Sequence, residues 1–212
     1  PPIGLYNVAA ALIDAGHEVV LANFYDRQGR PEEIRRAIAD IGPALVGISI
    51  LNANRLGGIE IARIAKEIDP QTTVVFGGVG ATFLWRLLLT HYPLIDYVVV
   101  GEGERPLADL VRHLENGDTK AASGTAAVAL RREGRVFCNP APPPVEDLDA
   151  HADPARYFSF SHVVSSRGCP SNCRFCGSPK FWHRRVRFHS PGYFVDQLQR
   201  LTLIQIRRPD QR

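Results

Sequence analysis

Three cysteines lie close together in this chain, at Cys169, Cys173 and Cys176. Cysteine thiolates are the usual protein ligands of iron–sulfur clusters. Three thiolates on one short loop can hold three irons of a [4Fe-4S] cluster and leave the fourth iron without a protein ligand. An iron with an open position can bind a small molecule, so this spacing favours a reaction site on the loop.

Two simpler interpretations remain open. The three cysteines and His183 could hold a structural zinc ion, although zinc sites usually bring two ligand pairs separated by a longer insert. A disulfide framework is less favoured, because three clustered cysteines cannot pair evenly. The fourth cysteine, Cys138, ends the apolar run Val136-Phe137-Cys138 and is expected to be a small buried side chain.

The loop resembles the signature of the radical S-adenosylmethionine (SAM) superfamily, which is C-x3-C-x2-C with an aromatic residue, here Phe175, before the third cysteine. The flanking sequence segments, residues 165–170 and 177–182, are similar to those of the cobalamin-binding branch of that superfamily. The resemblance runs from Pro1 to about Leu201. It implies that SAM binds the open iron and that Phe175 packs near the adenine.

The resemblance implies an enzyme with three cofactors, which are a [4Fe-4S] cluster, SAM and cobalamin. An electron from a donor such as flavodoxin or ferredoxin would cleave SAM to methionine and a 5′-deoxyadenosyl radical, which takes hydrogen from an unactivated carbon of a small-molecule substrate. C-methylation is the commonest outcome in this branch. The alternatives are a radical SAM cyclase, a tRNA methylthiotransferase-like enzyme, and a fragment that binds cofactors without turnover. The methylthiotransferase is disfavoured because no cysteine precedes Cys138.

The first 117 residues alternate helical and strand patterns. Apolar residues with the spacing of one helix face begin at Leu5, Ile34, Ile61 and Leu107, and each such stripe needs a sheet to cover. Short β-branched segments at residues 17–24, 44–51, 72–76 and 97–100 are typical of strands. This alternation predicts an α/β fold, a flavodoxin-like (Rossmann-like) parallel sheet. Because the chain has no Met and opens on a helix, we expect the first, central strand to be missing before Pro1.

Ligands of such sheets bind where the parallel strands end. There the chain carries residues that resemble the Ser-x-Leu and Gly-Gly elements of cobalamin-binding domains. Glycines let a flat macrocycle approach the backbone, and hydroxyl and amide groups can bind its nucleotide tail. The resemblance implies cobalamin contacts at Ser49, Leu51, Asn52, Asn54, Gly77, Gly78, Gly101 and Glu102. Ordinary turn chemistry is the alternative for each. Pro1 aligns with the axial histidine of that family, which implies cobalamin without a protein imidazole ligand.

The pattern changes after Gly117. Residues 127–130 and 136–139 indicate a hairpin, and a Pro-rich acidic linker follows. The segment 162–166 predicts a strand that leads into the cysteines, and Ser190 is placed to cap a helix. We predict a cobalamin-binding domain at 1–120, a hairpin and linker at 121–158, and the first part of a radical SAM (β/α) TIM-like barrel at 159–212. Such a barrel needs more strand–helix units, so we expect the chain to be truncated at both ends.

Composition limits the partners. The net charge of +3 is too small to indicate nucleic acid, and no apolar run reaches the roughly 18 residues of a membrane span. Unpaired clustered cysteines indicate a reducing compartment, so we expect a cytoplasmic protein. Between Arg174 and Val195 there are five Lys or Arg residues and two His but no acid. This segment is either a solvated basic face or a source of one or two cations for the SAM carboxylate or an anionic substrate.

Overall fold

The computed structural model describes residues 2–27 and 29–206. Its contacts divide the chain into two compact units. One unit is Ala22–Pro142, and the other combines Pro1–Leu21 with Pro143–Arg212. Residues 1–21 were predicted to belong to the cobalamin-binding domain, but they group with the second half of the chain. The predicted division into domains therefore stays a prediction.

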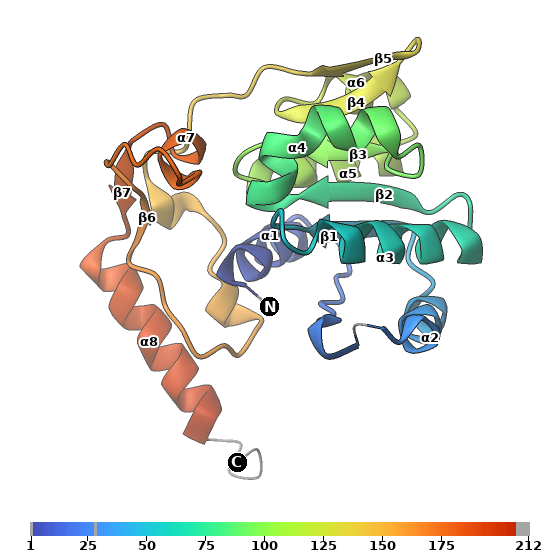
Figure 1. Ribbon diagram of the computed structural model, residues 1–212. Coiled ribbons are helices and arrows are strands. Elements are labelled where there is room, and N and C mark those ends of the chain that lie inside the picture. Colours follow the sequence, from blue (N-terminus) through green and yellow to red (C-terminus); the bar gives the residue numbers. More distant parts are fainter. Residues whose placement is uncertain (1, 28, 207–212) are drawn as a thin grey trace. The chain divides into compact units, whose positions relative to one another are not determined.

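The first unit is built on a five-stranded sheet, in which the strands lie in sequence order (Figure 1). The strands are β1 (Leu45–Ser49), β2 (Thr73–Gly77), β3 (Tyr97–Val99), β4 (Val128–Arg132) and β5 (Arg135–Cys138). β1, β2 and β3 are parallel, and β4 and β5 continue the sheet in antiparallel pairing. The predicted α/β architecture with a parallel sheet is confirmed.

The predicted hairpin also forms, but it belongs to the sheet. β4 pairs with the whole length of β3, with Val98 opposite Ala129. Arg131 of β4 donates hydrogen bonds to the carbonyl oxygens of Leu89 at 2.6 Å and Pro93 at 2.8 Å. These bonds satisfy carbonyls near the end of a helix, where intrahelical partners are lacking. The hairpin is thus held to the sheet by both its backbone and a side chain.

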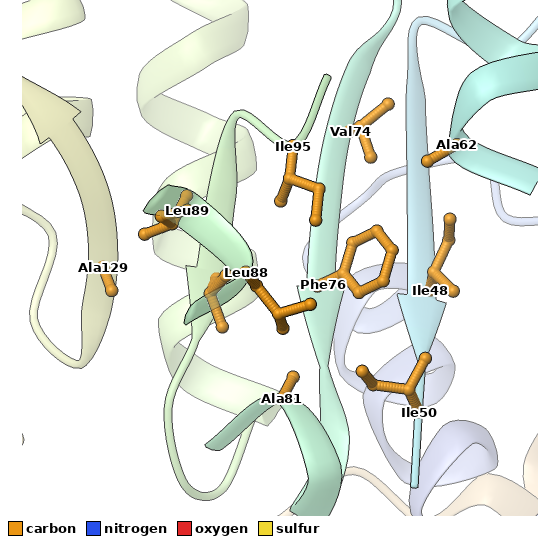
Figure 2. Close-up of a cluster of buried hydrophobic side chains, with 11 residues drawn as sticks. Ile48, Ile50, Ala62, Val74, Phe76, Ala81, Leu88, Leu89, Ile95 and Ala129 are labelled. Atoms are coloured by element: carbon orange, nitrogen blue, oxygen red, sulfur yellow. The ribbon is translucent and has the colours of Figure 1, made fainter. Parts of the chain in front are cut away.

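Helices precede β1 and follow each of the parallel strands in this unit. They are η1 (Tyr25–Arg27), α2 (Pro31–Ile41), α3 (Arg55–Ile68), α4 (Gly78–His91), α5 (Glu104–Glu115) and α6 (Thr119–Gly124). Phe76 of β2 is fully buried and lies among Ile48, Leu88 and their neighbours (Figure 2). Burying a side chain of this size stabilises a fold by about 1.5–3 kcal/mol. This cluster joins α3 and α4 to the sheet and so fixes the loops at the strand ends.

One predicted strand does not form. Residues 17–24 carry no strand in the structure, so that prediction is wrong. A strand is stable only when a neighbour completes its hydrogen-bond ladder. Among the described residues, no strand lies beside residues 17–24 to complete such a ladder.

The second unit contains short elements and two longer helices. They are α1 (Ile3–Asp14), η2 (Leu148–Ala150), η3 (Pro154–Arg156), β6 (Ser166–Gly168), α7 (Ser178–Phe181), β7 (Val186–Phe188) and α8 (Pro191–Ile206). We expected the apolar stripe of α1 to cover a sheet, but it is Tyr6 of this helix that makes ring contacts, and they lie within its own unit. Tyr6 stacks on Phe160 with ring centres 5.0 Å apart and contacts Phe158 at 5.5 Å.

The strand before the cysteines lies later than predicted. We predicted residues 162–166, whereas β6 starts at Ser166 and pairs with β7 in an antiparallel sheet of two strands. The strand begins later because β7 pairs only with residues 166–168. As at residues 17–24, a segment without a hydrogen-bonding neighbour does not form a strand. Two antiparallel strands do not make a (β/α) barrel, so the barrel stays a prediction. Across the described residues, the structure has no helix long and apolar enough to cross a membrane.

Candidate functional site

The carboxyl ends of β1 and β2 lie side by side, with Ser49 opposite Gly77. The loop after β1 closes on itself, because the Leu51 amide donates to Oδ1 of Asn54 at 2.7 Å. Arg55 donates to the carbonyl oxygen of Asn52 at 2.9 Å. Asn54 therefore has a structural role in the loop, while Ser49, Leu51 and Asn52 remain exposed at this edge.

Two glycines pack the start of α4 against this loop. A Cβ at Gly80 would lie 2.6 Å from the carbonyl carbon of Leu51, and one at Gly78 would lie 2.7 Å from Oγ of Ser49. The Gly80 amide donates to the carbonyl oxygen of Ile50 at 2.9 Å. Gly78 was predicted as a cofactor contact, yet its packing alone requires glycine. Gly80 was missed, although it follows Gly78 at a spacing of two.

The other predicted glycines differ from these two. No atom lies within 4 Å of where a Cβ would stand at Gly77 or Gly101. Such open backbone at the strand ends can accept a flat ligand. Thr82, which was not predicted, joins the loops because its hydroxyl donates to the Gly78 carbonyl and accepts from the Gly101 amide, both at 2.9 Å.

Acidic residues follow β3. Glu102 is half-buried, and Glu104 is 5% exposed in the first turn of α5. A carboxylate at that place is favoured by the helix dipole. Sequence reasoning selected Glu102, but Glu104 is the more buried of the two acids.

The cysteine loop is fixed at its start by backbone contacts. Cys169 donates its amide hydrogen to the carbonyl oxygen of Arg185 at 3.1 Å, directly after the β6–β7 pairing. Gly168 has φ of 123°, and a Cβ there would overlap the same carbonyl oxygen. Only glycine fits this position, so Gly168 fixes the path of the backbone just before Cys169.

The remaining cysteines lie on a more open stretch. The Cys176 amide donates to the Cys173 carbonyl at 3.3 Å, Cys173 is exposed, and the Phe175 side chain is 94% exposed. The backbone amide and then the hydroxyl of Ser178 hydrogen-bond the Cys176 sulfur and lower the pKa of that thiol. A lowered pKa favours the thiolate, which is the form that binds metals.

All three cysteines are free thiols. Across the described ranges, no three His, Cys, Asp or Glu side chains are arranged to hold a metal ion, so neither the three-thiol set nor the zinc set with His183 is assembled. The donor chemistry nevertheless fits a cluster, since three unpaired thiols share one exposed loop. Binding would require the loop to draw the thiols together.

Comparison with known proteins identifies the first half of the chain. The family model of the B12 binding domain matches residues 1–111, which includes every predicted strand-end loop. The chain belongs to the B12-binding domain family. The predicted recognition of a cobalamin-binding fold is thereby confirmed.

Curated relatives match almost the whole B12-binding chain. An anaerobic magnesium-protoporphyrin IX monomethyl ester cyclase of Rubrivivax gelatinosus is 30% identical over 95% of this chain and 39% of its own length. An uncharacterized methyltransferase of Pyrococcus horikoshii is 30% identical over 93% of this chain and 45% of its own length. The hopanoid C-3 methylase of Methylococcus capsulatus is 31% identical, with coverages of 94% and 40%. The chain thus spans less than half the length of these enzymes.

The strand-end loops of the B12-binding chain fit a macrocycle. Besides the open backbone at Gly77 and Gly101, the edge exposes large apolar side chains, with Leu51 59%, Val79 37% and Phe83 46% exposed. Val79 and Phe83 are four residues apart on α4 and therefore lie on one helix face. Pro1, the position that aligns with an axial histidine, lies outside the described residues.

The basic segment around the cysteines is partly used in structural contacts. Arg185 pairs with Glu146 at 2.6 Å, Arg187 donates to the Val145 carbonyl, and His189 pairs with Asp149 at 2.9 Å. These side chains are therefore not simply a solvated face. The other cations of the segment, Arg174, Lys180 and Arg184, are exposed.

Proposed function

We propose that this chain is part of a cobalamin-dependent radical SAM enzyme that modifies a small-molecule substrate, with C-methylation of an unactivated carbon as its reaction. The observation that carries the proposal is the presence of two features in one chain. A B12-binding domain matches residues 1–111, and a loop with three free thiols in the spacing C-x3-C-x2-C follows it.

Each region has a separate task in this proposal. When bound, the [4Fe-4S] cluster and SAM supply a 5′-deoxyadenosyl radical, and cobalamin supplies the methyl group. Cys169, Cys173 and Cys176 would supply the thiolates that hold the cluster. Exposed Phe175 lies beside them and would cover the adenine. The surrounding protein orients the cofactors and keeps water from the reacting centre.

The strand-end loops bind the second cofactor. Gly77 and Gly101 let the macrocycle lie against the backbone, and Leu51 gives an apolar contact. The hydroxyl of Ser49 and the amide of Asn52 would hydrogen-bond the nucleotide tail. Gly78 and Asn54 act through the loop they build, and Glu102 lies at the edge of the same surface.

The proposal extends to the surroundings of the chain. Reduction requires an electron donor such as flavodoxin or ferredoxin, and such chemistry requires a reducing compartment such as the cytoplasm. Cyclisation is the second candidate reaction, because the Rubrivivax gelatinosus relative is named as a cyclase. Transfer of a labelled methyl group from SAM to product distinguishes the two reactions, since cyclisation alone transfers none.

Anaerobic reconstitution with iron and sulfide tests the cluster. The chain should take up about four irons and develop a broad charge-transfer absorption. A variant with Cys169, Cys173 and Cys176 all replaced by alanine should lose both signals. Cys138→Ala is the matched control and should keep them, because Cys138 pairs within the sheet and burial raises the pKa of its thiol. Stoichiometric zinc without iron uptake would refute the proposal.

A further inference from the structure

An acidic segment follows the prolines of the linker, at residues 145–149, and contacts the strand that leads out of the cysteine loop. Arg187 of β7 is 6% exposed and donates a hydrogen bond to the Val145 carbonyl oxygen. Arg185, just before β7, pairs with Glu146, but both side chains are more than half exposed. An exposed ion pair contributes little to stability, so this pair alone does not hold the strand.

Asp149 makes the more buried contacts of the acidic segment. Both of its carboxylate oxygens lie 3.2 Å from the Ser190 amide, and Oδ1 lies 2.9 Å from Nδ1 of His189. The His189 side chain is 7% exposed, and its ring stacks on Tyr193 with centres 4.2 Å apart. Ser190 in turn accepts from the Tyr193 amide at 3.1 Å and caps α8. Asp149 therefore fixes the junction between β7 and α8.

That junction is linked to the first cysteine through the β6–β7 ladder. The His189 amide donates to the Ser165 carbonyl at 2.9 Å, and Arg167 lies opposite Arg187. The ladder ends where Cys169 donates to the Arg185 carbonyl. The backbone of Cys169 thus depends on where β7 lies, although Asp149 does not touch any cysteine.

We propose that Asp149 is a positioning residue for the cysteine loop. It holds His189 and Ser190, these residues fix β7, and β7 fixes the backbone of Cys169. That Asp149 thereby supports cluster binding rests on the proposed function. The contact chain itself does not depend on any cofactor.

Asp153 offers a matched control within the same unit. Its carboxylate accepts from the Ala155 amide and from Gln197, each at 3.0 Å, and pairs with Arg200. Asp153 caps η3, and like Asp149 it contacts the region of α8. Its partners on α8 lie about two to three turns beyond Ser190, however, and neither belongs to β7.

Amide hydrogen exchange measured by NMR on the full chain tests the contact chain. In Asp149→Ala the Cys169 amide should exchange about tenfold faster, because a hydrogen-bonded charged group is removed from the support of β7. Asp153→Ala should leave that rate unchanged while lowering the thermal midpoint. Asp149→Asn keeps an acceptor for the Ser190 amide and should restore most of the protection. Equal rates at Cys169 in Asp149→Ala and Asp153→Ala would overturn the inference.

Iron uptake by the same variants connects the inference to the cofactor. Asp149→Ala should incorporate less iron than Asp153→Ala, and its reduced cluster should show a broadened electron paramagnetic resonance signal. Equal iron content and equal spectra in the two variants would contradict the role in cluster binding. If the unaltered chain takes up no iron, the proposed function fails, and the Cys169 exchange rate still decides whether Asp149 positions the loop.

Discussion

The two candidate cofactor regions are organised in opposite ways. At the strand ends, neighbouring loops contact each other directly, with Gly80 against Leu51 and Thr82 bonded to both Gly78 and Gly101. The cysteine loop has an ordered start at Gly168 and an exposed remainder. The first region is preorganised for its ligand, whereas the second must still gather its thiols. Packing has already built the first surface, whereas a bound cluster would have to complete the second site.

The start of the cysteine loop should be the position most sensitive to substitution. Gly168→Ala places a methyl group on the Arg185 carbonyl and strains a φ of 123°. We expect a loss of about 3 kcal/mol in the free energy of unfolding of this unit, measured by chemical denaturation. Gly192→Ala, where a Cβ would lie 3.8 Å from Oγ of Ser190, should be neutral or stabilising. Equal changes in unfolding free energy for Gly168→Ala and Gly192→Ala would refute the claim that the start of the cysteine loop is ordered by Gly168.

The packing of the strand-end loops should be the next most sensitive feature. Gly80→Ala would force the start of α4 away from Leu51, and we expect a loss of about 1–3 kcal/mol in the unfolding free energy. Gly57 is exposed near the start of α3, and no atom lies within 4 Å of where its Cβ would stand, so Gly57→Ala should stabilise the helix by about 0.5–1 kcal/mol. A neutral Gly80→Ala would mean that the loops are not preorganised.

Replacing Asp149 in the acidic segment should have the smallest effect on the free energy of unfolding, and the effect should depend on pH only in acid. Burial raises the pKa of Asp149, but the hydrogen bonds from Ser190 and His189 outweigh it and lower the pKa overall. A lowered folded pKa gives stability that is present above the unfolded value of about 3.9 and lost as the pH falls through the folded value. The stability advantage over Asp149→Asn should therefore shrink below about pH 4. An advantage that persists at lower pH would contradict the lowered pKa.

Sequence patterns predicted those parts of the molecule that depend on local chemistry. Helix stripes, the parallel strands and the hairpin at residues 127–139 follow from periodicity and turn residues. The strand predictions at 17–24 and 162–166 failed because pairing depends on a distant partner that composition does not reveal. In the same way, the cysteine spacing marks the loop, but Gly80, Thr82 and Asp149 act through segments remote in sequence. Their roles became visible only with the contacts.

The central claim is that one chain carries two independent cofactor sites, and iron and cobalamin contents of a single anaerobic sample test it most directly. Gly77→Val fills open space at an extended strand end and should lower cobalamin binding while leaving iron unchanged. The triple Cys169, Cys173, Cys176→Ala variant should lose iron and keep cobalamin. Loss of both cofactors in either variant, or of neither in both, would contradict the account.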